Sequence, residues 1–475
     1  MGQSDFKVAL VRAFSQSDYK EPAEPLGVEA LAAMLGKYGF ECRVYDREME
    51  KQDDIIADIL AYRPSLVGLS VMMEDNTYDA LQIIARLRPK LDGAAYVAGG
   101  LFVTTNHDKA RARFPSHCQL IIGEGEVPLL RLCCELSGRQ QDITQKNTLH
   151  PSEWPWLYRH ELDEYIRIGA PINMRTSRGC PGQCRFCATP YMPDGLNKWQ
   201  ARQIADVADE MEMLCKSHHP HAYNFVDDDF GALSRVEDLT AELKNRGLRC
   251  ALILQLRANT IMNDPNLYDR MKKLNAGGLC RVFIGLESFD QDTLKWFNKP
   301  LDPGKTLKAF RTIQDAGVAV HIGYILWHPM STEESVRNEA QALWDSGFFT
   351  TKIVMGKLQL FPGCGLQLEH PEKTRISFPL EDYYNVVAQK IAPLYDAWLP
   401  GALCVPGLIC LSWLEQGGKA ASDVLEIEAQ LARLDELSYA VLMNPDAVSD
   451  ETISQTAKDV KERLHETGCT FDLRR

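Results

Sequence analysis

Short apolar runs alternate with helical patterns along residues 1–140 of the chain. Apolar residues recur at helical spacing over 27–36 and 78–87, between successive apolar runs. Apolar strands separated by helices are typical of a doubly wound, Rossmann-like parallel sheet, in which ligands bind beyond the carboxyl ends of the strands. The strands of this α/β domain are expected at residues 6–11, 42–45, 66–71, 95–98 and 120–122.

A second alternating series begins after residues 141–171, which are polar, contain several prolines and are expected to form a linker. Its six strand–helix units are too few for a closed eight-stranded barrel, so residues 172–365 are expected to form a partial (βα)6 TIM-like barrel. Residues 366–475 have helical patterns without strands and are expected to form a helical C-terminal cap. The barrel strands are expected at residues 172–177, 222–227, 251–257, 282–287, 318–326 and 353–361.

Length and charge narrow the range of functions. A chain of 475 residues is long enough for two or three domains. Its formal charge is 52 − 65 = −13 and no segment concentrates Lys and Arg, so a nucleic-acid partner is not expected. The sequence has no secretory signal and no run of eighteen apolar residues. We therefore expect a cytoplasmic protein without a membrane span that acts on a small molecule or a peptide.

Three of the 14 cysteines stand together directly after the first strand of the second series. Cys180, Cys184 and Cys187 have a Cys-x3-Cys-x2-Cys spacing, which lets three thiolates bind three irons of one cubane. No fourth cysteine is nearby, and an open position is typical of catalytic rather than structural metal sites. The alternatives are incidental thiols or a zinc site completed by a distant His, although zinc usually takes two Cys-x2-Cys pairs and a second pair is missing.

At this motif the sequence resembles the radical S-adenosylmethionine (SAM) enzymes, whose Cys-x3-Cys-x-aromatic-Cys loop follows the first strand of a partial barrel. The aromatic position here is Phe186. The resemblance implies a [4Fe–4S] cluster whose open iron is chelated by the amino and carboxylate groups of SAM. It implies that reductive cleavage of SAM gives a 5′-deoxyadenosyl radical, which abstracts hydrogen from the substrate. It also implies an electron donor such as flavodoxin or ferredoxin.

The ends of the later barrel strands match the positions at which this family contacts SAM. The resemblance places acidic groups at 227–229 near the SAM ammonium, Arg257 near its carboxylate and Glu287 near its ribose. An acidic helix N-cap is an equally good interpretation of any one of the three Asp residues. A buried Glu287 needs a ligand or a cation beside it. The implied SAM contacts are Phe186, Asp227, Asp228, Asp229, Arg257, Glu287, Ser288 and Trp327.

The first domain resembles the cobalamin-binding domain fused to one large subgroup of radical SAM enzymes. The Asp-x-His-x2-Gly motif of other cobalamin proteins is absent, as is usual for this subgroup. The alternative is a domain that does not use cobalamin, as in an aminoglycoside diol dehydratase among the relatives. The implied cobalamin contacts are Leu26, Ser70, Gly99, Gly100, Gly123, Glu124 and Gly125. Methylthiotransferase relatives carry a second cluster here, but the cysteines of this domain lack that spacing and are expected to be core thiols.

Two residues near the expected barrel mouth are candidates for catalysis. Cys364, in a Pro-Gly-Cys turn, could donate a hydrogen atom to a product radical, although a small buried residue is the favoured interpretation. His328 is a structural histidine, a general base or an adenine contact, and the structural role is favoured.

The resemblance favours a radical SAM methyltransferase of natural product biosynthesis that carries out cobalamin-dependent C-methylation. Dehydration, epimerisation or rearrangement of a metabolite is the alternative reaction. A non-catalytic iron–sulfur or cobalamin redox sensor is the alternative of another class, but such a protein needs an output module, and no DNA-binding helix pair is recognisable in the sequence.

Overall fold

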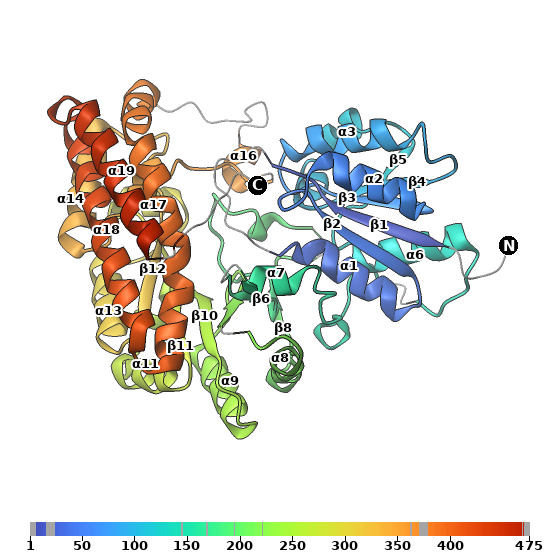
Figure 1. Ribbon diagram of the computed structural model, residues 1–475, viewed down its shortest axis with the longest axis horizontal. Coiled ribbons are helices and arrows are strands. Elements are labelled where there is room, and N and C mark those ends of the chain that lie inside the picture. Colours follow the sequence, from blue (N-terminus) through green and yellow to red (C-terminus); the bar gives the residue numbers. More distant parts are fainter. Residues whose placement is uncertain are drawn as a thin grey trace.

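The computed structural model describes residues 6–15, 24–143, 146–167, 170–193, 195–220, 222–361, 363–369, 379–467 and 469. It contains two five-stranded parallel sheets, one in each half of the chain, and a C-terminal layer of long helices (Figure 1). The expected α/β fold class with a helical C-terminal region is confirmed.

The first sheet has the strand order β2-β1-β3-β4-β5 and is doubly wound. Alternate residues of β1 face opposite layers: Val8 and Leu10 pack with α1 and α6, whereas Ala9 and Val11 pack with α2 and α3. Helices therefore cover both faces, which explains why the strands are apolar throughout. The strands are β1 (Lys7–Arg12), β2 (Glu41–Asp46), β3 (Leu66–Ser70), β4 (Ala95–Gly99) and β5 (Cys118–Leu120). The helices are α1 (Leu26–Lys37), α2 (Gln52–Tyr62), α3 (Asn76–Leu87), α4 (Leu101–Thr105), α5 (His107–Arg113) and α6 (Glu126–Ser137).

One strand of this sheet differs from its expected position. The strand expected at 120–122 ends at Leu120, and the chain then enters the loop that leads to Gly123 and α6. The carboxyl ends of β3 and β4 meet at one edge, where Ser70 lies in register with Gly99. The sheet therefore brings the glycine-rich loops together, as the doubly wound pattern predicts.

The second sheet has the order β12-β11-β10-β9-β6, with every neighbouring pair parallel. A separate antiparallel pair, β7 with β8, flanks the three clustered cysteines. The strands are β6 (Ile172–Met174), β7 (Ser177–Arg178), β8 (Gln200–Ala201), β9 (Ala222–Phe225), β10 (Ala251–Leu256), β11 (Leu279–Glu287) and β12 (Ala319–Tyr324). The helices are η2 (Thr189–Tyr191), α8 (Ile204–His218), α9 (Leu233–Asn245), α10 (Ala258–Ile261), α11 (Leu267–Ala276), α12 (Gln291–Trp296), α13 (Pro303–Asp315) and α14 (Glu333–Ser346).

The sixth barrel strand, expected at 353–361, was predicted wrongly. Helix α15 (Thr351–Met355) occupies its first part, and Lys357 then forms an isolated parallel bridge with Trp327. A short apolar run does not distinguish a buried strand from a buried helical turn by its periodicity. The described residues therefore form a barrel sheet of five strands with an open side between β6 and β12.

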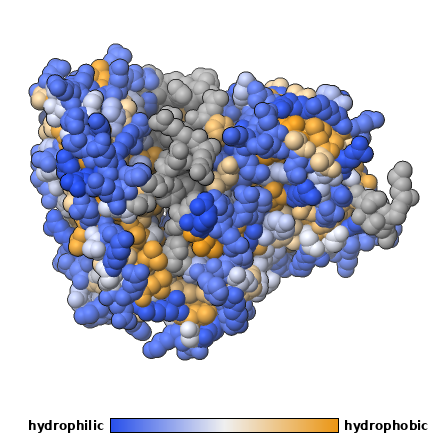
Figure 2. Space-filling model, viewed as in Figure 1, coloured by the Kyte–Doolittle hydropathy of each residue, from blue (hydrophilic) through white to orange (hydrophobic). Residues whose placement is uncertain are grey.

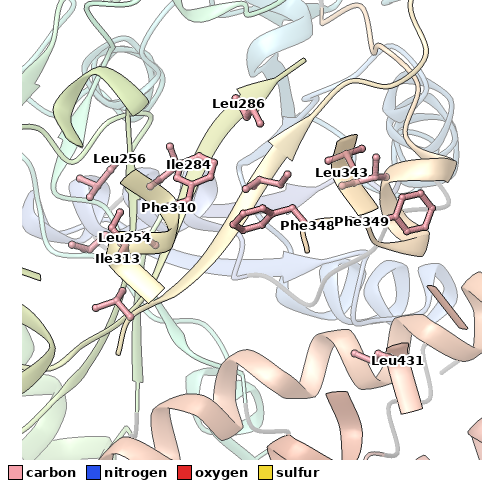
Figure 3. Packing of buried hydrophobic residues seen from close by; sticks show 14 of the residues in the cluster. Leu254, Leu256, Ile284, Leu286, Phe310, Ile313, Leu343, Phe348, Phe349 and Leu431 are labelled. Atoms are coloured by element: carbon pink, nitrogen blue, oxygen red, sulfur yellow. The ribbon is translucent and has the colours of Figure 1, made fainter. Parts of the chain in front are cut away.

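The outer face of the barrel sheet forms the largest hydrophobic core of the protein. Leu254 and Leu256 of β10 and Ile284 and Leu286 of β11 belong to the same core cluster as Phe310 and Ile313 of α13 (Figure 3). This core orients the strands so that their carboxyl ends point to the loop that carries the cysteines.

The described residues of segment 141–171, which was expected to be a linker, contribute to the cores of both halves of the chain: Leu149 and Trp154 pack in the first half and Leu162 in the second. This segment contains η1 (Pro151–Glu153) and α7 (Leu162–Arg167). The buried guanidinium of Arg159 binds Glu24 at 2.9 Å and Glu210 at 3.1 Å, and these partners belong to opposite halves of the chain. Such a buried, hydrogen-bonded ionic group is costly to break. The segment thus joins the two domains rigidly.

The C-terminal region is helical, as expected. It comprises α16 (Gly365–Leu368), α17 (Glu381–Glu415), α18 (Gly418–Met443), η3 (Pro445–Ala447) and α19 (Asp450–Glu466). Helix α17 is long and apolar enough to cross a membrane by length and composition alone, but it packs against α18, α19 and the strands β9–β11 (Figure 1). The visible face of the molecule is mostly hydrophilic, with hydrophobic residues in separate patches (Figure 2).

Candidate functional site

The three clustered cysteines lie on the loop between β7 and β8, beyond the carboxyl end of the barrel sheet. All three are free and half-buried. The backbone N–H of Gly182 donates to Cys180 Sγ at 3.3 Å, and the N–H of Cys187 donates to the carbonyl of Cys184 at 3.2 Å. A Cβ at Gly182 would lie 3.3 Å from Cys180 Sγ, so only glycine allows this close turn without displacing a neighbour.

The thiols of this loop are close enough to influence one another. Burial is the main cause that raises the pKa of Cys184 to about 11; Lys299 opposes it, and Glu287, Cys187 and Cys180 contribute smaller increases. No group of three His, Cys, Asp or Glu side chains among the described residues converges on a single metal position. A cubane takes each thiolate on a different iron, so its ligands need not converge. The donor set of three soft thiols on one glycine-containing loop fits an iron–sulfur cluster.

Aromatic side chains pack beside this loop. Phe186 stacks edge-to-face on Phe297 with ring centroids 5.1 Å apart. Cys364 is fully buried in the same small apolar cluster, and burial raises the pKa of its thiol. A buried, protonated thiol fits the favoured interpretation of Cys364 as a small packing residue. His328 also belongs here: its ring packs against Trp296 and Phe297, and burial lowers its pKa to about 4.

The three consecutive Asp residues after β9 have different surroundings. Asp227 is buried and accepts hydrogen bonds from the N–H groups of Thr176 and Ser177 at 2.7 and 2.8 Å and from the Thr176 hydroxyl at 2.5 Å. Burial, partly offset by these bonds, raises the pKa of Asp227 to about 6. Asp227 therefore fixes the backbone between β6 and β7, and its carboxylate oxygens are occupied within the protein instead of facing SAM.

The other two Asp residues lie nearer the cysteine loop. Asp228 is open to a cavity between the two domains, yet the surrounding protein raises the pKa of its carboxyl group by burial. Asp229 is buried, which raises the pKa of its carboxyl group; the N–H of Gly231, which donates to it at 3.2 Å, and the charge of Arg257 partly offset this effect. Successive residues of an extended chain point in opposite directions, so only Asp228 lines the cavity.

Arg257 follows the third strand of the barrel sheet and lies directly beside the cysteine loop. A Cβ at Gly182 would lie 3.7 Å from Arg257 Nε. In the part of the chain that the structure describes, no hydrogen bond or ion pair engages the Arg257 guanidinium, although it acts electrostatically on Cys180 and Asp229. A half-buried cation without a direct partner is a candidate for binding an anionic ligand group.

Glu287, at the end of β11, has the cation that its burial requires. Lys299 Nζ lies 2.7 Å from Glu287 Oε1, and both side chains are largely buried. Two glycines give this ion pair its space, because a Cβ at Gly285 would lie 2.1 Å from Glu287 Oε1 and one at Gly323 would lie 3.4 Å from Oε2. Glu287 itself has a positive φ of 73°, which turns its carboxylate inward from the strand end.

Two further residues with expected SAM contacts are engaged within the protein. Ser288 donates to Glu339 Oε1 at 3.0 Å and accepts from the N–H of Asp290 at 2.9 Å. Trp327 is 2% exposed, and its indole N–H donates to the carbonyl of Val354 at 2.8 Å. Both residues therefore stabilise the fold, and the Trp327 ring has no open face for an adenine.

A cavity of about 420 Å³ lies between the two domains. Its walls come from the carboxyl ends of the first sheet on one side and from the cysteine-loop region on the other. The residues with expected cobalamin contacts that line it are Ser70, Gly99, Gly100, Gly123, Glu124 and Gly125. Leu26 does not line it, whereas its neighbours Gly27 and Val28 do. Asp228, Arg178 and Gly179 line it from the barrel side.

Glycine is required at one point of this wall. Gly100 has a φ of 107°, and a Cβ there would lie 2.6 Å from the carbonyl oxygen of Val71. The wall at this point is therefore backbone, which leaves room for a flat ligand close to the strand ends. The glycine-rich backbone lining fits a cobalamin held at the sheet edge.

The sequence interpretation missed the ion pairs at the floor of the cavity. Arg178, within the cysteine motif, binds both Glu124 and Glu126 and lies over the ring of Trp154 at 4.4 Å. Arg175 lies 3.7 Å from Glu126. The available signal in the sequence was the presence of Arg175 and Arg178 five and two positions before the first cysteine, and of two Glu residues soon after a strand. Their pairing across 52 residues requires the fold.

Comparisons with known proteins agree with this geometry. Residues 17–132 match the family model of the B12 binding domain, and residues 174–343 match that of the radical SAM superfamily. The uncharacterized methyltransferase PH0819 of Pyrococcus horikoshii is 25% identical over 357 residues, and the match covers 70% of this chain and 76% of that protein. The hopanoid C-3 methylase of Methylococcus capsulatus is 22% identical over 321 residues, covering 64% of this chain and 61% of that protein.

Solved structures share the fold. The cobalamin-dependent SAM radical enzyme OxsB, with aqua-cobalamin and SAM bound, has a TM-score of 0.70 at 15% identity, covering 98% of this chain and 80% of OxsB. The radical SAM methyltransferase TsrM from Kitasatospora setae, with cobalamin and a [4Fe–4S] cluster bound, has a TM-score of 0.60 at 20% identity, covering 77% and 78%.

Proposed function

Because the chain belongs to the radical SAM superfamily, in the subgroup with an N-terminal B12-binding domain, we propose that it transfers a methyl group to an unactivated carbon of a small molecule. Its cofactors are a [4Fe–4S] cluster, SAM and cobalamin. The observation that carries the proposal is the shared cavity, in which the glycine-rich strand ends of the B12-binding domain face the cysteine-loop region of the barrel. The two relatives described above are a methyltransferase and a methylase by name.

In the proposed enzyme, Cys180, Cys184 and Cys187 bind three irons of the cluster and leave one open. When bound, the cluster and SAM supply a 5′-deoxyadenosyl radical, and cobalamin supplies a methyl group. Phe186 and Phe297 exclude water from the cysteine loop. A dry site protects a radical from side reactions.

Charged residues around the loop position SAM in this proposal. Arg257 binds the carboxylate of SAM, and Glu287, held by its ion pair with Lys299, accepts a hydrogen bond from the ribose. Asp228 faces the cavity between the domains and attracts positively charged groups there. The Arg178 pairs with Glu124 and Glu126 fix the two cavity walls relative to each other.

Anaerobic protein with a reconstituted cluster, given SAM and a reductant such as reduced flavodoxin or ferredoxin with or without cobalamin, tests the proposal. A methyltransferase of this type consumes two SAM molecules per turnover, so 5′-deoxyadenosine and S-adenosylhomocysteine both form, the latter only with added cobalamin. Cys184→Ala is the matched control. Formation of 5′-deoxyadenosine without cobalamin-dependent S-adenosylhomocysteine favours the alternative dehydration, epimerisation or rearrangement. Absence of both products contradicts a radical SAM enzyme. The proposed location is the cytoplasm, where such electron donors are present.

A further inference from the structure

Two cysteines outside the cysteine loop lie against each other at the amino end of the barrel sheet. Cys215 is in the last turn of α8, and Cys250 directly precedes β10. Their Sγ atoms are 3.7 Å apart, although the residues are 35 positions apart in the chain. Both thiols are free. We call these two residues the thiol pair.

The parallel strands of the barrel sheet bring the thiol pair together. Strands β9 and β10 begin side by side, with Ala222 in register with Ala251. Helix α8 precedes β9 in the chain and packs on its outer face, where Met211 belongs to the same core cluster as Tyr223. The last turn of α8 therefore lies beside the start of β10. The cysteine loop lies beyond the opposite, carboxyl edge of this sheet, so the thiol pair is separate from the site described above.

A buried tyrosine completes the surroundings of Cys215. The Tyr223 side chain is fully buried, and its hydroxyl oxygen lies 3.1 Å from Cys215 Sγ. The hydroxyl also donates to the carbonyl of Met211 at 3.1 Å. Its single hydrogen can turn from that carbonyl to a thiolate, because a charged acceptor forms the stronger hydrogen bond. A thiolate at Cys215 would therefore accept hydrogen bonds from both Tyr223 and Cys250.

The two thiols differ in acidity and in exposure. The hydrogen bond with Cys250 is the main cause that lowers the pKa of the Cys215 thiol against the effect of burial, and Tyr223 acts in the same direction. The same hydrogen bond, together with burial, raises the pKa of Cys250. Cys215 is half-buried, whereas Cys250 is 3% exposed. Since the thiolate is the nucleophilic form, Cys215 is the reactive member of the pair and Cys250 is its protected, protonated neighbour.

Another half-buried thiol of this protein has the opposite surroundings. Cys42 of β2 is half-buried like Cys215, but burial raises its pKa to about 12, and the charge of the neighbouring Glu41 adds to this effect. Cys42 is therefore protonated at neutral pH. The difference between the two thiols follows from their hydrogen bonds and neighbouring charges rather than from exposure, so Cys42 is a matched control for Cys215.

We propose that the thiol pair is a modification site for small disulfides such as oxidised glutathione. The Cys215 thiolate attacks one sulfur of the reagent, whose S–S bond breaks, and the first thiolate leaves and takes up the proton that Cys215 released. Cys250 then attacks Cys215 Sγ in this mixed disulfide, its proton passes to the second leaving thiolate, and a Cys215–Cys250 disulfide remains. The pair loses two electrons, and the reagent is reduced to two thiols. The product joins α8 to the start of β10 and is reversed by excess thiol.

Peptide mapping of the anaerobic holoenzyme tests this inference. Trypsin separates the two thiols into peptides 203–216 and 250–257, each with one cysteine, and places Cys42 in peptide 38–43. At pH 7, iodoacetamide should alkylate Cys215 at least about 100-fold faster than Cys42, because far more of it is thiolate. In a separate sample, oxidised glutathione should link peptides 203–216 and 250–257 through a disulfide, and excess reduced glutathione should separate them. Because each peptide is identified by its mass, the result does not depend on the proposed reaction.

Variants of each group assign the roles. Cys250→Ser should accumulate the glutathione adduct on Cys215, since no second thiol resolves it, whereas Cys215→Ser should give no adduct on Cys250. Tyr223→Phe should raise the pH midpoint of Cys215 alkylation, because the thiolate loses one hydrogen-bond donor. Equal alkylation rates of Cys215 and Cys42, no linked peptide in the wild type, or an adduct on Cys250 in Cys215→Ser overturns the inference. An unchanged midpoint in Tyr223→Phe overturns the role of Tyr223.

Discussion

Replacing Arg178 by Met tests how strongly ion pairs hold the two domains together at the cavity. Arg178 binds Glu124 and Glu126, and all three side chains are mostly buried. Burial raises the pKa of Glu126, but Arg178 and Arg175 outweigh it and lower the pKa to about 2 from an ordinary 4.5. At about 1.4 kcal/mol for each tenfold change in affinity for the proton, the charged form of Glu126 is favoured by about 3 kcal/mol after the cost of burial is included.

The variant should lose most, but not all, of this stabilisation. Arg175 remains 3.7 Å from Glu126 and compensates part of its charge. We therefore expect Arg178→Met to lower the free energy of unfolding by about 2 kcal/mol at neutral pH. Urea unfolding measured by tryptophan fluorescence follows this loss, and one of the eight tryptophans, Trp154, lies under the Arg178 guanidinium. A double-mutant cycle with Glu126→Gln should give a coupling of about 2 kcal/mol.

The pH dependence provides an independent check. In the wild type, the depressed pKa of Glu126 contributes stability that is complete above pH 4.5 and is lost as the pH falls toward 2. In Arg178→Met, burial dominates and raises the pKa of Glu126. The loss of unfolding free energy relative to the wild type is therefore largest at neutral pH, and it becomes smaller as the pH falls and Glu126 is protonated. A coupling below about 0.5 kcal/mol would refute the reasoning. So would a loss of stability that does not change with pH, or an equal loss in the exposed control Arg311→Met.

Three other changes test separate parts of the structure. Cys184→Ala should abolish the visible absorbance of the cluster in anaerobically reconstituted protein, and retained absorbance would contradict the ligand assignment. Gly100→Ala should destabilise the protein by about 2 kcal/mol and weaken cobalamin binding, measured by thermal unfolding and equilibrium dialysis, because φ is 107° and Val71 lies 2.6 Å from the new Cβ. The raised pKa of Asp227, about 6, makes the wild type lose stability as pH rises from about 4 to 6, so Asp227→Asn should be relatively more stable at pH 8 than at pH 5. The affinity of Asp227→Asn for SAM should equal that of the wild type. A reduced affinity would indicate that Asp227 contacts SAM.

The sequence alone allowed the two parallel sheets and the cysteine loop to be predicted. Buried parallel strands are short and apolar, and β1, β3 and β4 have this pattern. The strand expected at 353–361 was not recognisable as a helix, because an apolar run of that length is compatible with either state.

Site residues were predictable as positions but not as contacts. The sequence places 227–229 at a strand end, and only the backbone geometry decides that Asp228 lines the cavity while Asp227 bonds to Thr176. The need of Glu287 for a cation followed from burial, whereas the identity of Lys299 required the fold. Trp327 was placed by motif, but its indole N–H is used by Val354, a residue 27 positions away.

The cavity between the domains has walls from both halves of the chain, and this has a kinetic consequence. A cofactor held between these walls contacts both halves, and separation of the halves must break the salt bridges of Arg178 and of Arg159 at once. Exchange of the corrinoid would then be slow and limited by opening of the protein rather than by the strength of individual contacts. A bound cofactor would in turn stabilise both halves against unfolding. Insertion of the cofactor during biosynthesis would therefore stabilise the assembled protein.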